Sequence, residues 1–161
     1  MSDLEIKADI IEVLESGIFK TEYVFQSREG ILGIMSLKAG KSDGIYKAAD
    51  GTEMLLKKTS FWKSNYEWRD GETLVGGAMP RKALRPTFII KFQGNSVVLS
   101  PGGNKARSWR VRNSSNQEPC EIQPRGVFKR GARLLIRAEI PIGLLVFCYC
   151  LVSIRWQERT S

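Results

Sequence analysis

Residues 140–154 have the sequence IPIGLLVFCYCLVSI, in which only Ser153 is polar. Charged residues flank this run, with Glu139 before it and Arg155 after it. Pro141 fixes a φ that suits the first turn of a helix, and the rest of the run would extend about 20 Å as a helix. A bilayer core is about 30 Å thick, so such a helix is too short to span it. Because a helix that is apolar on every side belongs inside a protein, the sequence predicts a central helix at about residues 141–155.

Two other structures remain open for this run. It contains β-branched and aromatic residues that would also suit a central strand: Val146, Phe147, Tyr149 and Val152. It could also form a short C-terminal membrane anchor, with Trp156 at the lipid interface. The three alternatives differ in what covers the apolar side chains. A shell of strands would cover a central helix, neighbouring strands would cover a central strand, and lipid would cover a membrane anchor.

The rest of the chain predicts short antiparallel strands. Apolar and polar residues alternate with period two in several runs, and most of these runs are separated by Gly or Asn turn signals. Residues 18–26 and 31–37 flank one such turn, and residues 88–92 and 96–99 flank another. Each of the two pairs predicts a β-hairpin.

A short internal repeat also indicates hairpins. Residues 46–54 and 66–74 share the pattern Tyr-x-x-x-Asp-Gly-x-x-apolar at an offset of 20 residues. Asp-Gly favours a type I′ turn, so each copy predicts a strand, a turn and a second strand. Residues 109–113 and 118–122 look like a third, degenerate copy with a longer polar turn between them.

Charge is distributed unevenly along the chain. The 161 residues include 25 basic and 17 acidic ones, which gives a net charge of +8. Residues 1–29 contain seven acidic and three basic residues, whereas residues 76–138 contain thirteen basic residues and only Glu118 and Glu121 as acidic ones. The second segment therefore has a net charge of +11 and should attract anionic partners.

The basic segment supplies the candidate binding residues. If residues 109–112 form a strand, Arg110 and Arg112 share one face of the sheet while Trp109 and Val111 point toward the core. Guanidinium groups suit bidentate contacts with phosphate, although a solvated surface without a ligand is an equal alternative. The predicted anion- or phospholipid-binding residues are Arg81, Lys82, Arg85, Lys105, Arg107, Arg110, Arg112, Lys129 and Arg130.

Enzyme chemistry has little support in the sequence. The chain has no histidine, which removes the commonest general base and the commonest ligand of catalytic zinc or iron. It has no Gly-x-Ser-x-Gly motif, and its three cysteines, Cys120, Cys148 and Cys150, lack metal-ligand spacing. We expect these thiols to be reduced and buried. The sequence predicts a binding module without catalytic residues, metal or cofactor.

The order of these features resembles the tubby C-terminal-like superfamily, which includes the LURP-one-related and phospholipid scramblase domains. The features are the hairpins with Tyr, Trp and Asp-Gly turns, the basic later half and the apolar run near the C-terminus. The resemblance implies a mainly β fold, a closed antiparallel barrel of about twelve strands around one hydrophobic helix. Residues 1–161 would form this single domain, with residues 142–154 in the central helix. No site residues of the family are carried over.

Three functions follow as expectations. The first is a module whose basic face binds anionic phospholipid head groups at a membrane surface. The second is a nucleic-acid-binding barrel with Phe61, Trp62 or Trp68 as stacking platforms, but Tyr66 and Trp68 share one predicted face and are better suited to the core. The third is a small tail-anchored membrane protein. The start of the chain lacks the features of a secretory signal, so we expect a cytoplasmic protein, either free or peripheral to a membrane.

Overall fold

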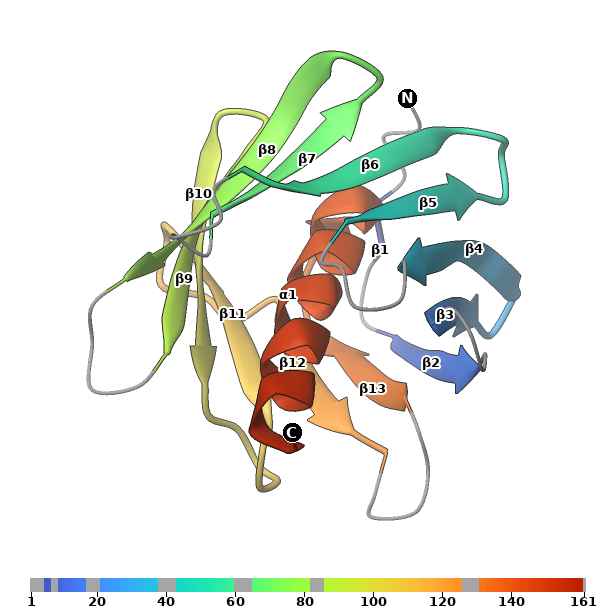
Figure 1. Cartoon of the computed structure of the whole chain (residues 1–161). Helices are drawn as coiled ribbons and strands as arrows, with labels where there is room; N and C mark the ends of the chain where they lie inside the picture. Colours follow the sequence, from blue (N-terminus) through green and yellow to red (C-terminus); the bar gives the residue numbers. More distant parts are fainter. Residues whose placement is uncertain are drawn as a thin grey trace.

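The computed structural model describes residues 5–6, 9–16, 21–37, 43–59, 65–81, 86–125 and 131–160. Within these ranges the chain forms fourteen β-strands and one α-helix (Figure 1). Twelve of the strands close into an antiparallel barrel, in which each strand pairs with the next one in sequence and the last pairs with the first. This confirms the predicted fold class, a closed antiparallel barrel of about twelve strands with one C-terminal helix.

The barrel strands are β2 (Ile10–Ser16), β3 (Thr21–Ser27), β4 (Gly30–Leu37), β5 (Gly44–Ala48), β6 (Glu53–Lys58), β7 (Tyr66–Asp70), β8 (Thr73–Arg81), β9 (Thr87–Phe92), β10 (Asn95–Pro101), β11 (Trp109–Asn113), β12 (Cys120–Pro124) and β13 (Gly131–Ile136). Two short strands, β1 (Glu5–Ile6) and β14 (Ile140–Pro141), pair with each other outside the barrel. The helix α1 spans Ile142–Thr160 and follows β14 directly. The pairs β3–β4, β5–β6, β7–β8, β9–β10 and β11–β12 confirm the five predicted hairpins. The last of them is shifted, because β12 begins at Cys120 and not at residue 118, and residues 18–20 of the first predicted strand lie outside the described residues.

The helix α1 fills the interior of the barrel (Figure 1). Residues 145–152 are at most 1% exposed. The ring of Phe147 stacks on Trp68 of β7 with centroids 5.4 Å apart, and Tyr149 meets the rings of Tyr23 and Phe25 of β3 edge to face. The apolar run is therefore the predicted central helix and not a strand, and strands cover the side chains that an anchor would expose to lipid.

Among the described residues, no helix has both the length and the apolar character needed to cross a membrane.

The helix is longer than predicted. It continues past residue 155 to Thr160. Two side chains of this extension bond to the barrel: the Trp156 indole N–H donates to the Arg107 carbonyl at 3.0 Å, and the Gln157 amide donates to the Tyr23 hydroxyl at 3.0 Å. The charge at Arg155 ends the apolar pattern but not the helix.

Strand residues alternate between the interior and the outer surface. The inward side chains are apolar, and Tyr66 and Trp68 are 2% and 0% exposed, which confirms their predicted place in the core. Glycine occurs where an aromatic ring comes close to the backbone. A Cβ atom at Gly76 would lie 2.9 Å from the ring of Phe92, and one at Gly143 of α1 would lie 3.2 Å from the same ring. The interior thus pairs large rings with small neighbours.

The predicted type I′ turns at the two Asp-Gly sites are wrong. Gly51 and Gly71 have φ values of 91° and 59°, but neither preceding aspartate has a positive φ, which a type I′ turn requires. Near Gly71 a register shift between Trp68 and Arg69 alters the geometry of the hairpin. The turn between β9 and β10 has the type I′ signature instead, with φ of 49° at Gln93 and 82° at Gly94.

Removing the ring at the centre of the barrel should strongly destabilise the fold. The substitution Phe147→Ala leaves a cavity against Trp68, and we expect the free energy of unfolding to fall by about 3–5 kcal/mol. Leu74→Ala is the control because Leu74 is 55% exposed, and its effect should stay within about 0.5 kcal/mol. Denaturant unfolding followed by tryptophan fluorescence measures both. Equal stability of the two variants would contradict a packed helix inside the barrel.

Candidate anion-binding end of the barrel

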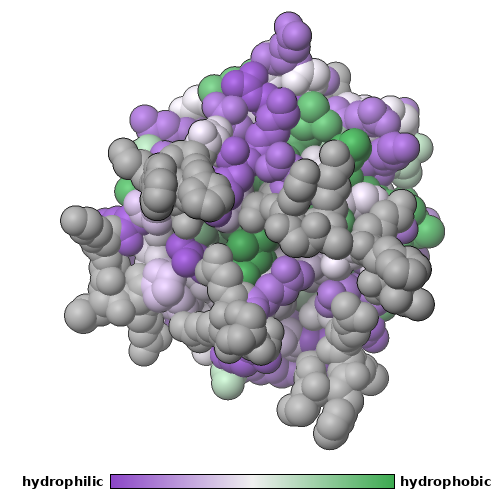
Figure 2. All heavy atoms as spheres, viewed as in Figure 1, coloured by the Kyte–Doolittle hydropathy of each residue, from purple (hydrophilic) through white to green (hydrophobic). Residues whose placement is uncertain are grey.

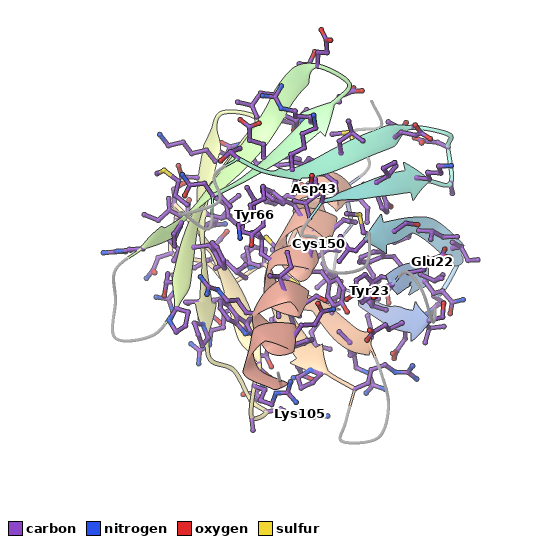
Figure 3. All side chains as sticks on the ribbon, in the orientation of Figure 1. Glu22, Tyr23, Asp43, Tyr66, Lys105 and Cys150 are labelled. Atoms are coloured by element: carbon purple, nitrogen blue, oxygen red, sulfur yellow. The ribbon has the colours of Figure 1, made fainter. Side chains whose placement is uncertain are left out.

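The two ends of the barrel carry different connections. At the end where α1 begins, the strands are joined by residues 28–29, 49–52, 71–72, 93–94 and 114–119, and we call it the turn end. At the other end, residues 102–108 join β10 to β11 beside the end of α1, where Arg107 accepts the hydrogen bond from Trp156. We call this second end the basic end, after its exposed residues Arg81, Lys105 and Arg107. In Figure 3 Lys105 lies beside the last turn of α1.

The sequence is polarised between these ends. The turn-end connections contain four acidic residues and one basic residue, whereas residues 102–108 contain Lys105 and Arg107 and no acidic residue. Five further connections follow barrel strands that end at the basic end, and most of their residues are outside the described ones: 17–20, 38–42, 60–64, 82–85 and 126–130. The sequences of these stretches contain eight Lys or Arg residues and no Asp or Glu, and the described remainder of the five connections adds one acidic residue, Asp43, and one basic residue, Arg125.

Residues 102–108 fold tightly against the outer face of β12. Gly102 N–H donates to the Ser108 carbonyl at 2.8 Å, and Ser108 N–H donates to the Lys105 carbonyl at 3.2 Å. Gly103 has a φ of 143°, and a Cβ atom there would lie 2.9 Å from the carboxyl carbon of Glu121. Glycine is needed at this position for both its backbone conformation and its small size.

The carboxylate of Glu121 fastens this segment to the barrel wall. Its side chain is 3% exposed and accepts hydrogen bonds from the backbone N–H of Asn104 at 3.2 Å, from the Gln123 amide and from the Arg137 guanidinium at 3.1 Å. Burial raises the pKa of Glu121, but these hydrogen bonds and the Arg137 charge outweigh it, so the pKa lies below its ordinary value. The charged carboxylate therefore holds Lys105 and Arg107 in place.

Three of the predicted binding residues are exposed at the basic end and have no carboxylate partner among the residues that the structure describes. Lys105 and Arg107 are exposed on the segment that joins β10 to β11, and the Arg107 guanidinium lies 5.7 Å from the centre of the Trp156 ring. Arg81 is exposed at the end of β8, opposite Thr87 of β9. Since only β9 lies between β8 and β10, these strand ends are about 10 Å apart.

Arg110 and Arg112 share an outward face of the sheet, as predicted, but both guanidinium groups already form ion pairs. Both point outward from β11, while Trp109 and Val111 are 4% and 0% exposed, as predicted. Both guanidinium groups donate to one carboxylate oxygen of Glu118, at 3.1 and 3.0 Å. Hydrogen bonding by Arg112 and the charge and hydrogen bond of Arg110 lower the pKa of Glu118. These two arginines are thus ion-paired on the outer face of β11, which we call part of the barrel wall, whereas Lys105 and Arg107 have no such pair among the described residues.

Other cations of the basic segment are paired in the same way. Arg133 and Arg125 of this segment both lie against Glu12 of β2, at 3.0 and 3.5 Å. Of the remaining candidates, Lys82, Arg85, Lys129 and Arg130 lie outside the described residues. The sequence analysis did not single out Arg155, whose guanidinium lies 5.0 Å from the centre of the Phe88 ring near the basic end. The charged flank of the apolar run was the signal that could have indicated it.

The described residues offer no alternative site for metal or thiol chemistry. Among them, no group of three His, Cys, Asp or Glu side chains is placed to hold a metal ion. Cys120, Cys148 and Cys150 are buried, as predicted, and burial raises the pKa of each thiol. Thiolate nucleophiles are therefore disfavoured at all three positions.

Of the three predicted base-stacking residues, the structure describes only Trp68. Trp68 is fully buried against Phe147, so it cannot serve as a stacking platform. Phe61 and Trp62 lie outside the described residues.

Comparisons with protein-family models, with curated proteins and with solved structures find no match to this chain. The candidate site thus rests on its own geometry and charge.

Acid should destabilise the protein through Glu118 and Glu121. Both pKa values are lowered by folding, so their contribution is complete above the ordinary glutamate pKa of 4.5 and is lost as the pH falls through the folded-state values. We expect Glu121→Gln to lower stability at neutral pH and to reduce the loss on acidification. Thermal unfolding as a function of pH measures this. The exposed pair Lys47–Glu53 provides the control Glu53→Gln, which should keep the wild-type pH profile, and an unchanged profile for Glu121→Gln would contradict the assignment.

Proposed function

We propose that the protein is a non-enzymatic binding module that engages anionic phospholipid head groups at a membrane surface through its basic end. One observation carries the proposal: Arg81, Lys105 and Arg107 are exposed at the same end of the barrel and have no ion pair in the described part of the chain. Many of the other cations of the basic segment already face a carboxylate. Three of the cations that remain for an anionic partner in the described part of the chain are therefore at this one end.

A flat anionic surface suits this arrangement better than a small ligand. The cations extend from two different elements and are not gathered around a described pocket. A lysine or arginine near an anionic bilayer contributes about 1 kcal/mol to binding. The turn end carries more acidic than basic residues in its connections, so a negative surface would repel it and attract the basic end. The polarity of the barrel thus favours one orientation at the membrane.

The architecture has the fold that the resemblance noted from the sequence implied. A barrel of twelve antiparallel strands around one apolar helix is what similarity to the tubby C-terminal-like superfamily, including the LURP-one-related and scramblase-like domains, implied. That group gave the expectation of anionic phospholipid binding. A fold hosts many functions, so the proposal depends on the basic end and uses the resemblance only as support.

Reversing charge at the basic end should abolish vesicle binding. Purified protein is sedimented with phosphatidylcholine vesicles that either contain or lack phosphatidylserine and phosphoinositide, at low and high ionic strength. We expect binding only to the anionic vesicles and less of it at high salt. The double variant Arg81→Glu with Lys105→Glu should bind at least about thirtyfold more weakly, since two surface cations contribute about 2 kcal/mol.

A charge-matched control separates a specific site from net charge. Arg28→Glu with Lys47→Glu changes the net charge by the same amount, but Arg28 and Lys47 are exposed near the turn end. This control should keep most of the wild-type affinity. Equal losses in the two double variants would show attraction by net charge alone. Binding of single-stranded DNA by a protein that binds no vesicles would instead favour a nucleic-acid partner.

A further inference from the structure

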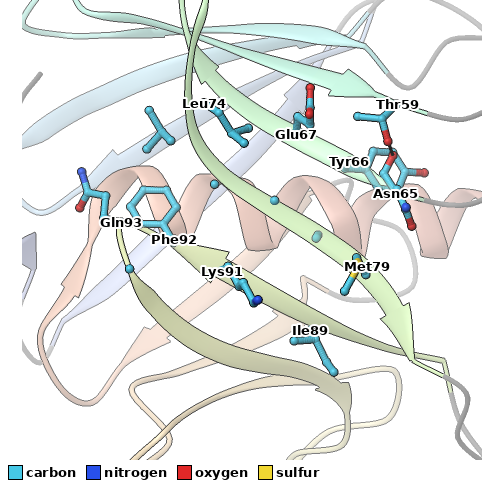
Figure 4. A pocket seen from close by; sticks show the side chains of 15 residues that line it. Thr59, Asn65, Tyr66, Glu67, Leu74, Met79, Ile89, Lys91, Phe92 and Gln93 are labelled. Atoms are coloured by element: carbon cyan, nitrogen blue, oxygen red, sulfur yellow. Dashed lines mark hydrogen bonds between the residues drawn. The ribbon is translucent and has the colours of Figure 1, made fainter.

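A groove of about 390 Å³ crosses the outer faces of β7, β8 and β9 (Figure 4). Its apolar walls come from Leu74, Val75, Met79 and Ile89, and Leu74 and Met79 are 55% and 51% exposed. Figure 2 shows that the described surface seen from the direction of Figure 1 is largely hydrophilic, with smaller hydrophobic areas between. A hollow with exposed apolar walls of this volume falls within the range of small-ligand sites.

The floor of the groove is open at Gly77. A Cβ atom built at Gly77 would have only the Tyr66 carbonyl oxygen within 4 Å, at 3.7 Å, and this glycine does not have a positive φ. Neither packing nor backbone conformation therefore requires glycine at this position. The missing side chain leaves a depression between the apolar walls.

Charge in the groove favours an anion. Two charged residues line it within the described part of the chain, Glu67 on β7 and Lys91 on β9. The Glu67 carboxylate accepts a 2.8 Å hydrogen bond from the Arg69 guanidinium, so its charge is already paired. Lys91 is exposed, has no partner in the described part of the chain, and sits directly opposite Gly77 in the strand register. One unpaired cation thus lies beside the floor of an apolar groove.

An extended peptide is a poor occupant. Strands β7, β8 and β9 are each paired on both sides, so their backbone groups cannot bind an added strand. The groove walls are mainly aliphatic, which suits a flexible alkyl chain. We propose that this groove binds the anion of a long-chain fatty acid, with the alkyl chain over Gly77 and the carboxylate near the Lys91 ammonium. This site is separate from the basic end and does not depend on its function.

Titration calorimetry with laurate below its micelle concentration tests the site. The wild-type protein should bind laurate saturably and bind dodecyltrimethylammonium, which has the same chain and the opposite charge, much more weakly. Gly77→Leu should fill the groove and weaken laurate binding at least about tenfold without lowering the unfolding temperature, since the position is open. Lys91→Met should weaken binding about threefold to fivefold, as expected for one exposed ion pair.

Two controls make the outcome specific. Lys57→Met removes an exposed cation from the neighbouring groove on β4, β5 and β6 and should leave laurate affinity unchanged. Lys105→Glu should weaken binding to anionic vesicles and leave laurate binding unchanged. Gly77→Leu should weaken laurate binding and leave vesicle binding unchanged. The experiment can therefore contradict the proposal for one site without contradicting the proposal for the other. Absence of saturable laurate binding, or equal binding by Gly77→Leu, would overturn the proposal. If Gly77→Leu unfolds more easily than the wild type, the Lys91→Met variant decides the test, and unchanged laurate affinity of that variant would overturn the proposal.

Discussion

A twelve-strand barrel is too wide for its own side chains to fill, and this constraint determines the rest of the structure. An eight-strand barrel is about the size at which side chains alone fill the interior, and the diameter grows with strand number. An α-helix with its side chains is about 10–12 Å across, so one helix can occupy the remaining space. That helix must be apolar all round, as residues 145–152 are, because strands surround it on every side.

The same constraint explains which parts of the fold could be predicted from the sequence. The run 140–154 has no polar face, and the strands alternate with period two, so both patterns directly indicate burial. Turn geometry is weaker in the sequence because Asp-Gly fits several turn types, and the local register decides between them. The end of α1 was missed since Arg155 marks the edge of the barrel interior, whereas the helix ends five residues later.

The candidate site was less predictable because charge pairing depends on contacts between distant residues. Arg133 pairs with Glu12, 121 positions earlier in the chain, since β13 closes the barrel against β2. Glu118 lies between the two arginines of β11 only because the following connection folds back beside that strand. A count of charges along the sequence could not separate these paired arginines from Lys105 and Arg107. Strand alternation did predict that Arg110 and Arg112 face outward.

The ion pairs on the outer faces of β11 and β13 neutralise arginines on the side of the barrel, and this makes the unpaired cations of the basic end more distinct. If the arginines of β11 and β13 were unpaired, the barrel would present positive charge on its side as well as at its end, and an anionic surface could attract it in several orientations. Glu12, Glu118 and Glu121 remove most of that lateral charge, and Glu121 also fixes the segment that carries Lys105 and Arg107. If the barrel binds an anionic surface as proposed, the acidic residues of the wall would favour one orientation without touching that surface.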